Sequence, residues 1–345
     1  MARVDIDGVR HSYDGTTWVL DGLDLVVESG EAHALLGPSG AGKTTLLNLL
    51  SGLLRPNAGR VRLDGRDVTA LPPHGRNIAQ VFQFPVLYPV MSVYENLAFP
   101  LRTRGIAADR VDGRVGVVAE LLGLTAMLGR RPSRLSSYDK QKVALGRGLV
   151  RTDVGAVLLD EPLTAVEPAA KWQLRRALKG VQRELGLTMI YVTHDQLEAL
   201  TFADRVSVIR DGRLLQSGSP EALVDDPAHT FIGHFIGSPG MNVIPAAVAG
   251  ALAPRSDTRS LEIGFRPEAA EVVAQPAGNA LAVRVESRDV LGTRDGVAWG
   301  VLTATLGGVT IRTRQRLDIE VPGPGWLVVD PARVRVFEHG WRVDA

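Results

Sequence analysis

One glycine-rich loop between two apolar segments constrains the fold of this chain more than any other feature. The loop follows the apolar residues 34–36 and leads into the largely apolar residues 45–50, which predicts a buried strand, a tight loop and a helix. It fits the spacing GxxxxGK[ST] and consists of Gly37, Pro38, Ser39, Gly40, Ala41, Gly42, Lys43 and Thr44. Glycines let successive backbone N–H groups point at one anion, and the helix N-terminus adds about half a positive charge. The sequence therefore predicts a cradle for phosphate groups.

The last two residues of the loop carry side chains suited to a nucleotide. We expect Lys43 to reach the β- and γ-phosphates, and the Thr44 hydroxyl to complete the ligand shell of a Mg²⁺ ion. ATP with Mg²⁺ is thus the predicted ligand. The alternative is a glycine-rich turn that binds nothing, which the preceding strand, the Lys-Thr pair and the following apolar helix disfavour.

Composition excludes several other classes of protein. The chain has 345 residues, enough for two domains, and its 39 Lys and Arg residues nearly balance its 38 Asp and Glu residues. This balance predicts no binding to nucleic acid or to an acidic membrane surface. The chain contains no cysteine, which excludes a disulfide scaffold, a thiolate metal site and a cysteine nucleophile. No apolar stretch approaches the roughly 20 residues of a spanning helix, so we expect a cytosolic chain that docks, at most, on a membrane protein.

Two acidic residues follow a second apolar run. Residues 156–159 read Ala-Val-Leu-Leu, and Asp160 and Glu161 come next. A buried strand delivers such residues to the carboxyl edge of the sheet, where open α/β folds bind ligands. There Asp160 is placed to hold Mg²⁺ through its water shell, and Glu161 is the natural general base for an attacking water. Adjacent acids after a strand also occur in solvated turns, but the phosphate loop upstream favours the functional interpretation.

A further strand is predicted at 189–192, followed by Thr193, His194 and Asp195 as the start of a helix. In this position the His194 side chain can hydrogen-bond a γ-phosphate. A single histidine at a helix start is otherwise a cap or a surface residue, so its role depends on the motifs around it.

Taken in order, these motifs resemble those of ABC-transporter ATPases. The chain has a Walker A motif at 37–45, Gln83 after a strand, Leu135-Ser136, a Walker B motif at 157–161, and the switch Thr193-His194-Asp195. The segment 88–102 is similar to the carbohydrate-uptake branch of the family, typified by the maltose ATPase. The segments 83–85, 140–151 and 198–203 look most like the paired ATPases of bacterial glycerol importers.

The resemblance implies a fold and a division into domains. The fold is an α/β P-loop NTPase, a RecA-like core with an antiparallel β subdomain and a helical subdomain at about 86–150, followed by a small all-β, OB-like regulatory domain. The implied domains are 1–235 and 236–345. In the second, alternating segments at 281–286 and 309–313, a Gly307-Gly308 hairpin and a last strand at 334–336 agree with a small β-barrel. Its aromatic residues are scattered, which favours dimer contacts or effector binding over nucleic acid.

The resemblance also implies roles for single residues. Tyr13 would stack on adenine, unless it is an ordinary strand residue, and Gln83 would touch Mg²⁺ or the lytic water. His194 would sense the γ-phosphate, and Ser136 would reach the nucleotide held by the other subunit of a dimer. The implied catalytic residues are Glu161, His194 and Gln83, the implied metal ligands are Thr44, Gln83 and Asp160, and the implied ATP-binding residues are Tyr13, Gly37, Pro38, Ser39, Gly40, Ala41, Gly42, Lys43, Thr44, Thr45 and, in trans, Ser136.

Partners and location follow from the same resemblance. It implies two membrane-spanning permease subunits, a paralogous or identical ATPase subunit and, indirectly, a periplasmic or lipoprotein solute-binding protein, at the cytoplasmic face of the cell membrane. It implies no nucleic acid. Apolar residues beside Gln83, where the family receives its membrane subunits, are either part of the core or an exposed docking patch. These residues are Phe84, Val86, Leu87 and Tyr88.

The chain departs from the family pattern in two loops. Where the family has Leu-Ser-Gly-Gly-Gln, this chain has Leu-Ser-Ser-Tyr-Asp at 135–139, and Glu167 replaces an aspartate after Walker B. An inward-pointing Asp139 would repel a phosphate by about 3 kcal/mol at roughly 5 Å and an effective dielectric near 20. Alternatively, Asp139 points outward and caps the next helix.

These departures leave two main hypotheses for function. The first is an ATPase that energises an importer of a small polyol or sugar, glycerol being suspected, as one half of an asymmetric pair with a paralogue. The second is a nucleotide-binding regulatory subunit with little hydrolysis of its own. A DNA-repair ATPase of the same superfamily is disfavoured, because the chain lacks a long heptad insertion and zinc-ligand cysteines.

Overall fold

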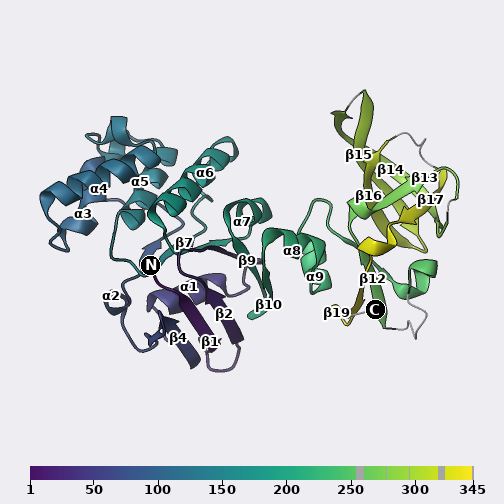
Figure 1. The fold of residues 1–345 in the computed structure, drawn as a ribbon, viewed down its shortest axis with the longest axis horizontal. Helices are drawn as coiled ribbons and strands as arrows, with labels where there is room; N and C mark the ends of the chain where they lie inside the picture. The colour runs from purple at the N-terminus through teal and green to yellow at the C-terminus, as the bar shows by residue number, and fades with distance from the viewer. Residues whose placement is uncertain (254–259, 277, 295, 318–322, 344–345) are drawn as a thin grey trace. The chain divides into compact units, whose positions relative to one another are not determined.

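The computed structural model describes residues 1–253, 260–276, 278–294, 296–317 and 323–343 (Figure 1). They form two compact units, Met1–Pro220 and Glu221–Ala345. The boundary expected from the sequence, at 235, lies after the observed division at Pro220. It would place α8 (Pro220–Asp225) and α9 (Thr230–Phe235) in the first domain. Contacts assign nearly all of both helices to the second unit, where the buried Arg266 donates hydrogen bonds to the carbonyl oxygens of Val224 at 2.8 Å and Gly233 at 2.9 Å.

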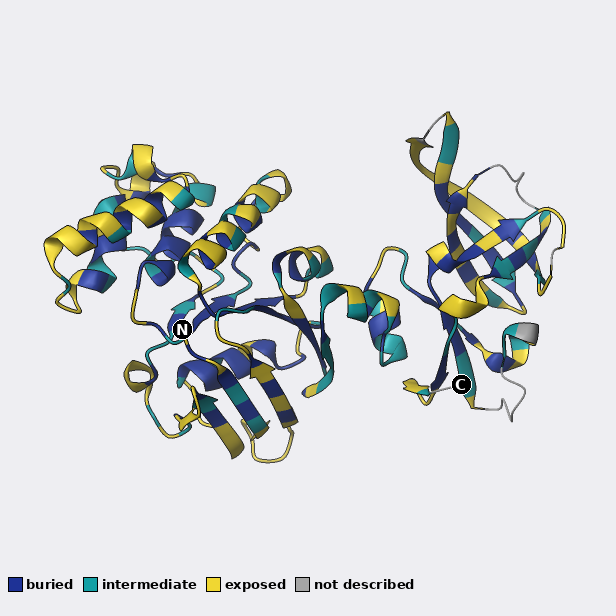
Figure 2. Ribbon diagram, in the orientation of Figure 1, coloured by how far each residue is buried: buried dark blue, intermediate teal, exposed yellow. Residues whose placement is uncertain are grey.

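A mostly parallel sheet forms the centre of the first unit. Its strand order is β10-β9-β3-β8-β7-β6, and only the β9–β10 pair is antiparallel. The strands β3 and β8 are buried at every residue, because layers of the unit cover both faces of the sheet. The central strands of this unit are largely dark blue, the colour of buried residues, in Figure 2. The strands are β3 (Ala32–Leu36), β6 (Ala79–Val81), β7 (Val157–Asp160), β8 (Met189–Thr193), β9 (Arg205–Arg210) and β10 (Arg213–Gly218).

An antiparallel sheet covers one side of this centre, with the helix α1 (Lys43–Ser51) between the two sheets. The segments 4–6 and 23–27 alternate between buried and partly exposed residues, so one face of the sheet enters the core. The sheet has the order β2-β1-β4-β5 and consists of β1 (Val4–His11), β2 (Leu20–Val27), β4 (Ala58–Leu63) and β5 (Arg66–Asp67). The predicted antiparallel subdomain is therefore present.

Helices form the other side of the first unit and share one apolar core with the central sheet. The predicted helical subdomain is present, and its helix α3 (Val93–Arg102) begins with a capping box between Ser92 and Glu95. The remaining helices of the unit are α2 (Pro73–Arg76), α4 (Ala108–Leu121), α5 (Ser137–Leu149), α6 (Pro168–Leu185) and α7 (Gln196–Phe202), with short 3₁₀ turns at Thr125–Met127 and Pro132–Arg134.

The second unit is built mainly from two antiparallel sheets around one apolar core. The predicted hairpin is present, since Gly307 and Gly308 both have positive φ angles, 54° and 85°, between paired strands. The first sheet has the order β11-β12-β18-β19 and consists of β11 (Asn242–Pro245), β12 (Leu261–Phe265), β18 (Arg335–Glu338) and β19 (Trp341–Val343). The second has the order β13-β17-β14-β15-β16 and consists of β13 (Ala270–Val273), β14 (Leu281–Arg294), β15 (Val297–Leu306), β16 (Val309–Arg316) and β17 (Gly323–Val329). The strand expected to close the series at 334–336 is followed by one more, β19, after a turn at His339 and Gly340.

Two amide side chains bind the free edges of the five-stranded sheet. Gln315 on β16 accepts a hydrogen bond from the Val272 N–H at 2.7 Å and donates to the Val272 carbonyl at 2.9 Å. Asn242 on β11 does the same for the backbone of Arg312, with both bonds at 2.8 Å. Each amide therefore makes the two hydrogen bonds that a neighbouring strand would make with that residue, so the edge strand is not left unpaired there.

None of the helices among the described residues is long and apolar enough to cross a membrane.

We expect Gln315→Leu to loosen the edge strand β13. The variant removes both partners of the Val272 backbone, and an unsatisfied buried polar group costs about 1–3 kcal/mol. Hydrogen exchange at the Val272 amide should therefore accelerate at least about ten-fold, measured on the full chain. Gln275→Leu is the control, because Gln275 is an exposed glutamine of the same unit. Unchanged protection of Val272 in the Gln315 variant would contradict this interpretation.

Candidate nucleotide-binding site

The phosphate loop connects β3 to α1, as predicted, and two of its glycines have no room for a side chain. A Cβ on Gly37 would lie 2.2 Å from the Ile209 carbonyl oxygen on β9. A Cβ on Gly42 would lie 2.8 Å from the Val19 carbonyl oxygen, and Gly42 has a φ of 94°. The loop therefore fits between two neighbouring segments only because these residues are glycines.

Lys43 lies folded into this loop. Its ammonium group donates hydrogen bonds of 2.8 Å to the carbonyl oxygens of Gly37 and Pro38, and the residue is buried. Burial lowers the pKa of Lys43, against the opposing influence of Glu161 and Asp160. The cation therefore stands at the centre of the loop, bound to carbonyl groups that phosphate oxygens can replace.

Thr44 and Asp160 provide two oxygen atoms at one point of the site. The Thr44 hydroxyl, at the start of α1, donates to the Asp160 carboxylate at the end of β7 over 3.4 Å. Burial raises the pKa of Asp160, and the neighbouring charge of Glu161 raises it further. A hydroxyl and a carboxylate are the hard oxygen ligands that Mg²⁺ prefers, with phosphates and waters as the others. The donor set therefore fits Mg²⁺.

Glu161 is held in an uncommon conformation directly after β7. Its φ of 43° is left-handed, which costs a residue other than glycine about 1–3 kcal/mol and is typical of functional sites. The carboxylate accepts a hydrogen bond from the Thr164 hydroxyl at 3.2 Å and lies 3.1 Å from Nδ1 of His194. The structure thus brings together two predicted site residues that are far apart in the sequence.

Hydrogen bonds of the adjacent residues hold His194 next to Glu161. Asp195 is the N-cap of α7 and accepts from the Glu198 N–H at 3.1 Å, and the buried Glu198 accepts from the Thr193 hydroxyl at 3.0 Å. The turn is therefore fixed on both sides of His194. Its imidazole remains about half exposed, at 54%, and faces the Glu161 carboxylate.

Tyr13 lies beyond β1 and is not a strand residue. The residue is 63% exposed, its hydroxyl lies 3.1 Å from the Thr45 hydroxyl on α1, and the His11 ring packs edge-on against its ring at 4.8 Å between centroids. Asp14 accepts hydrogen bonds of 2.8 Å from the backbone N–H groups of Thr16 and Thr17, which orders the turn. The ring therefore stands beside the phosphate loop, open to a flat ligand.

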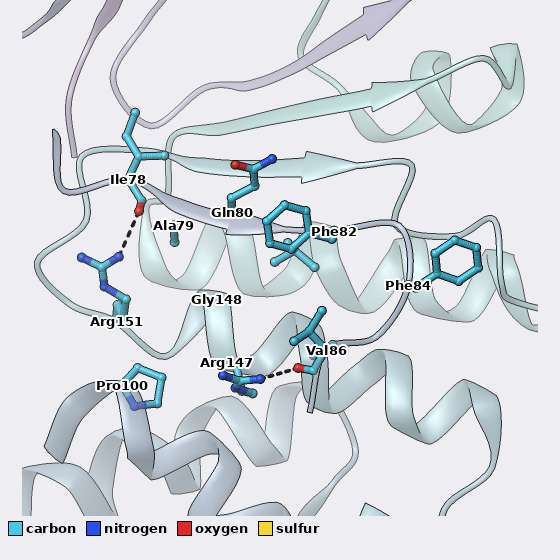
Figure 3. Close-up of a pocket in the computed structure, with 12 residues that line it drawn as sticks. Ile78, Ala79, Gln80, Phe82, Phe84, Val86, Pro100, Arg147, Gly148 and Arg151 are labelled. Carbon is cyan, nitrogen blue, oxygen red and sulfur yellow. Dashed lines mark hydrogen bonds between the residues drawn. The ribbon is translucent and has the colours of Figure 1, made fainter. Parts of the chain in front are cut away.

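Gln83 follows β6 and is half-buried, and the residues around it are exposed apolar side chains. Phe84 and Val86 are 70% and 58% exposed, which favours a docking patch over the core for these two, while Leu87 packs on the core. Phe84 and Val86 line a cavity of about 230 Å³, and Figure 3 shows their side chains there. There Arg147 donates a hydrogen bond to the Val86 carbonyl.

The segment 135–139 leads into α5 and forms its first turn. Ser136 is the N-cap: its hydroxyl accepts from the Asp139 N–H at 3.1 Å and donates to the Asp139 carboxylate at 2.7 Å. Asp139 also lies 3.0 Å from the Lys142 ammonium. Burial alone would raise the pKa of Asp139, but Ser136 and Lys142 outweigh it and the pKa lies below its usual value. Asp139 thus folds back onto its own helix, and it is Ser136 that caps it.

Sequence reasoning missed two residues that support Glu161. Thr164 binds its carboxylate, and the fully buried Gln141 on α5 donates to the Pro162 carbonyl at 2.7 Å. The signal for Thr164 is its place three residues after Glu161, in a turn closed by a 3.2 Å backbone bond. For Gln141 the sequence gives no such signal, because its partner lies on another segment.

Known proteins with similar sequences match between 72% and 100% of the chain. A family described as ABC transporter matches residues 20–164. The diacetylchitobiose uptake system ATP-binding protein MsiK of Streptomyces coelicolor is 38% identical, over 98% of this chain and 97% of that protein. The sn-glycerol-3-phosphate import ATP-binding protein UgpC of Chromohalobacter salexigens is 40% identical, over 100% and 98%. The trehalose/maltose import ATP-binding protein MalK of Thermococcus litoralis is 47% identical, over 72% and 68%.

Solved structures resemble the larger part of the chain. A protein of Clostridium perfringens named cbiO1, part of the ABC transporter complex cbiONQ, has a TM-score of 0.60 and 28% identity, over 64% of this chain and 89% of that chain. The ADP conformation of an ATP-binding cassette of an ABC transporter has a TM-score of 0.57 and 25% identity, over 67% and 98%.

The raised pKa of Asp160 predicts how magnesium-dependent nucleotide binding varies with pH. Only the carboxylate form of Asp160 binds Mg²⁺, so as the pH falls through the raised pKa, the affinity for MgATP should fall at a pH where an ordinary aspartate is still ionised. Calorimetry should then detect proton release on MgATP binding at mildly acidic pH. Asp160→Asn should abolish that release, and Asp109→Asn, at an exposed position on α4, should leave it unchanged. Identical proton release from the Asp160 variant and the unaltered chain would refute this assignment.

Proposed function

The chain belongs to the ATP-binding subunits of ABC transporters, and from this membership we propose that it hydrolyses ATP to drive an importer of a small sugar or polyol. Support for the direction and the solute class comes from relatives that match nearly the whole chain and are named for uptake or import. Those relatives are named for diacetylchitobiose and for sn-glycerol 3-phosphate, at 38% and 40% identity. Similarity of this kind supports a solute class, and glycerol itself stays a narrower prediction.

One observation carries the proposal of hydrolysis: Glu161 and His194 meet at 3.1 Å on the edge of the sheet that carries the phosphate loop. Lys43 exchanges its two carbonyl partners for phosphate oxygens when ATP binds, and Tyr13 stacks on the adenine. Thr44 and Asp160 hold Mg²⁺, and Gln83 reaches the metal or the water. When bound, Mg²⁺ neutralises charge on the phosphate oxygens.

The chemical step needs one proton acceptor and one donor to the γ-phosphate. A water oxygen attacks the γ-phosphorus in line, its proton passes to the Glu161 carboxylate, and the bond to the ADP oxygen breaks. His194 donates a hydrogen bond to a γ-phosphate oxygen. The left-handed backbone of Glu161 and the Thr164 hydroxyl hold the base in place for this transfer.

The exposed apolar patch next to Gln83 supports assembly with membrane subunits. We place two permeases and, through them, a solute-binding protein in the complex, with this chain at the cytoplasmic face of the membrane and no nucleic acid bound. Phe84 and Val86 expose apolar area beside a cavity, which is the surface such a contact needs. The position of Gln83 beside the patch couples the nucleotide to the permeases.

The altered loop supports an asymmetric ATPase pair. A signature serine acts in trans by donating its hydroxyl to a γ-phosphate, but the Ser136 hydroxyl already donates to Asp139 at 2.7 Å. The carboxylate of Asp139 would also approach the phosphate with the same sign of charge. This chain therefore supplies a working Walker face, and a paralogue supplies the opposing signature. The same contact favours a second candidate, a nucleotide-binding regulatory subunit with little hydrolysis.

Replacing the proposed base separates the two candidates. Glu161→Gln keeps the shape of the side chain and removes its proton affinity, so ATPase activity of the assembled transporter should fall about 100-fold or more while ATP binding persists. Glu184→Gln, at an exposed position on α6, should leave the rate unchanged. Solute uptake unaffected by the Glu161 variant would instead favour the regulatory subunit.

Replacing Asp139 tests the asymmetric pair. Asp139→Gln frees the Ser136 hydroxyl and removes the charge, so we expect ATP turnover by the purified chain alone to rise at least about five-fold, a change of about 1 kcal/mol. Asp109→Gln is the matched control. Turnover of the unaltered chain alone at the rate of a complete transporter, or no gain in the Asp139 variant, counts against the pair.

A further inference from the structure

A cavity of about 570 Å³ lies in the five-stranded sheet of the second unit, outside the nucleotide site. One wall is the edge strand β16 with Trp299 from β15. The opposite wall is formed by the start of β13, the end of β17 and the 3₁₀ turns Pro267–Ala269 and Pro331–Arg333. The volume falls within the range of about 300–1,000 Å³ that small-molecule sites occupy.

The cavity follows from incomplete closure of the sheet. The strands β13 and β16 are its two edges, and between them the Gln315 amide binds Val272 in place of a strand neighbour. A buried side chain spans this gap where a paired backbone would fill it, which leaves open space next to the bridge. Both polar atoms of the bridging amide make hydrogen bonds, and its oxygen also accepts from the Thr313 hydroxyl at 2.6 Å, so the bridge forms a polar wall of fixed geometry.

Backbone groups of β16 also face the gap. The Arg312 N–H and carbonyl bond Asn242, on the side of β16 away from β15. The side to which backbone groups point alternates along an extended strand, so the N–H and carbonyl of Arg314 point to the same side. Arg314 lines the cavity, and its backbone supplies one donor and one acceptor there.

The charged side chains that line the cavity are nearly balanced in sign, and they provide both hydrogen-bond donors and acceptors. Arg314 pairs with Glu268 across the gap at 3.2 Å, and both side chains remain about two-fifths exposed, at 42% and 43%. Arg316, Glu271 and Asp330 line the same space. Two cations and three anions leave no excess of positive charge, so the lining does not select an anion such as phosphate.

Trp299 adds a flat apolar surface. Its side chain is 38% exposed on β15, beside Arg316 on the neighbouring strand, and it lines the cavity. The face of an indole ring carries negative charge, which attracts the polarised C–H groups of a ring or chain whose oxygens point elsewhere. The hydroxyl groups of the same molecule can each donate to a carboxylate and accept from a guanidinium group.

From this combination we propose that the cavity between β13 and β16 is a binding site for a small neutral polyhydroxylated molecule, a sugar or polyol. The C–H face of the ligand lies on Trp299, and its hydroxyls bond Glu268, Arg314 and the Arg314 backbone. The proposal goes beyond ATP hydrolysis and transport, because it gives the second unit a ligand of its own.

The test uses the full chain with ¹⁵N-labelled tryptophan, which gives a separate indole signal for each ring. The Trp299 signal is assigned from Trp299→Phe. Glycerol, trehalose and inorganic phosphate are titrated in turn. We expect the Trp299 signal to shift saturably with glycerol or trehalose, with a Kd of about 1 mM or lower, while the signal of Trp341, an exposed ring that does not line the cavity, stays in place.

Two variants then connect the ligand to the proposed contacts. Glu268→Gln should weaken binding at least about ten-fold, and Glu286→Gln, at an exposed position on β14, should not change it. Unshifted signals of the other tryptophans show that each variant is folded. The proposal is overturned if Trp299 responds to phosphate alone, if it responds to none of the three probes, or if Glu268→Gln binds as tightly as the unaltered chain. Because the readout is an indole signal, these outcomes are independent of ATP turnover.

Discussion

The close approach of the phosphate loop to two neighbouring segments is the constraint on which the first unit depends. Gly37 lies against the carbonyl of Ile209 on β9, and Gly42 lies against the carbonyl of Val19, just before β2. The loop thus joins the parallel sheet to the antiparallel sheet by backbone contacts that tolerate no Cβ. With the backbone held on both sides, Lys43 is buried at a fixed point, and Thr44 is brought to the end of β7.

Two surface segments of the first unit are connected to the residues of this site. Gln83, a predicted site residue, leads from β6 to the exposed Phe84 and Val86, so it shares one short segment with the apolar patch. Ser136 and Asp139 begin α5, whose buried Gln141 bonds the carbonyl after Glu161. The start of α5 is therefore connected to the segment of the proposed base through one helix and one hydrogen bond.

In the second unit, side chains satisfy the backbone of the two edge strands of a sheet that does not close. Gln315 and Asn242 each satisfy one backbone residue of an edge strand. Side-chain amides reach across a wider gap than a backbone ladder does, because the bridging groups extend beyond the strand that carries them. The same bridge that stabilises the sheet therefore leaves the space in which Trp299 and the Arg314–Glu268 pair stand.

The sequence alone determined the parts of this protein that are contiguous. The phosphate loop, the acids after β7 and the Gly307-Gly308 hairpin each depend on backbone conformations and side chains of adjacent residues, so local pattern suffices to predict them. The architecture of both domains was predicted from the resemblance of these motifs to a known family, and the alternating segments at 281–286 and 309–313 agreed with the all-β second domain.

Tertiary structure decided every contact between distant segments. It placed Tyr13 beside Thr45, brought His194 to Glu161, and set the Gln141 amide against the Pro162 carbonyl. It also assigned α9 to the second unit, through the side chain of Arg266. Such contacts depend on how the layers pack and on which buried polar groups still need hydrogen-bond partners. Neither can be predicted from the pattern of neighbouring residues in the sequence.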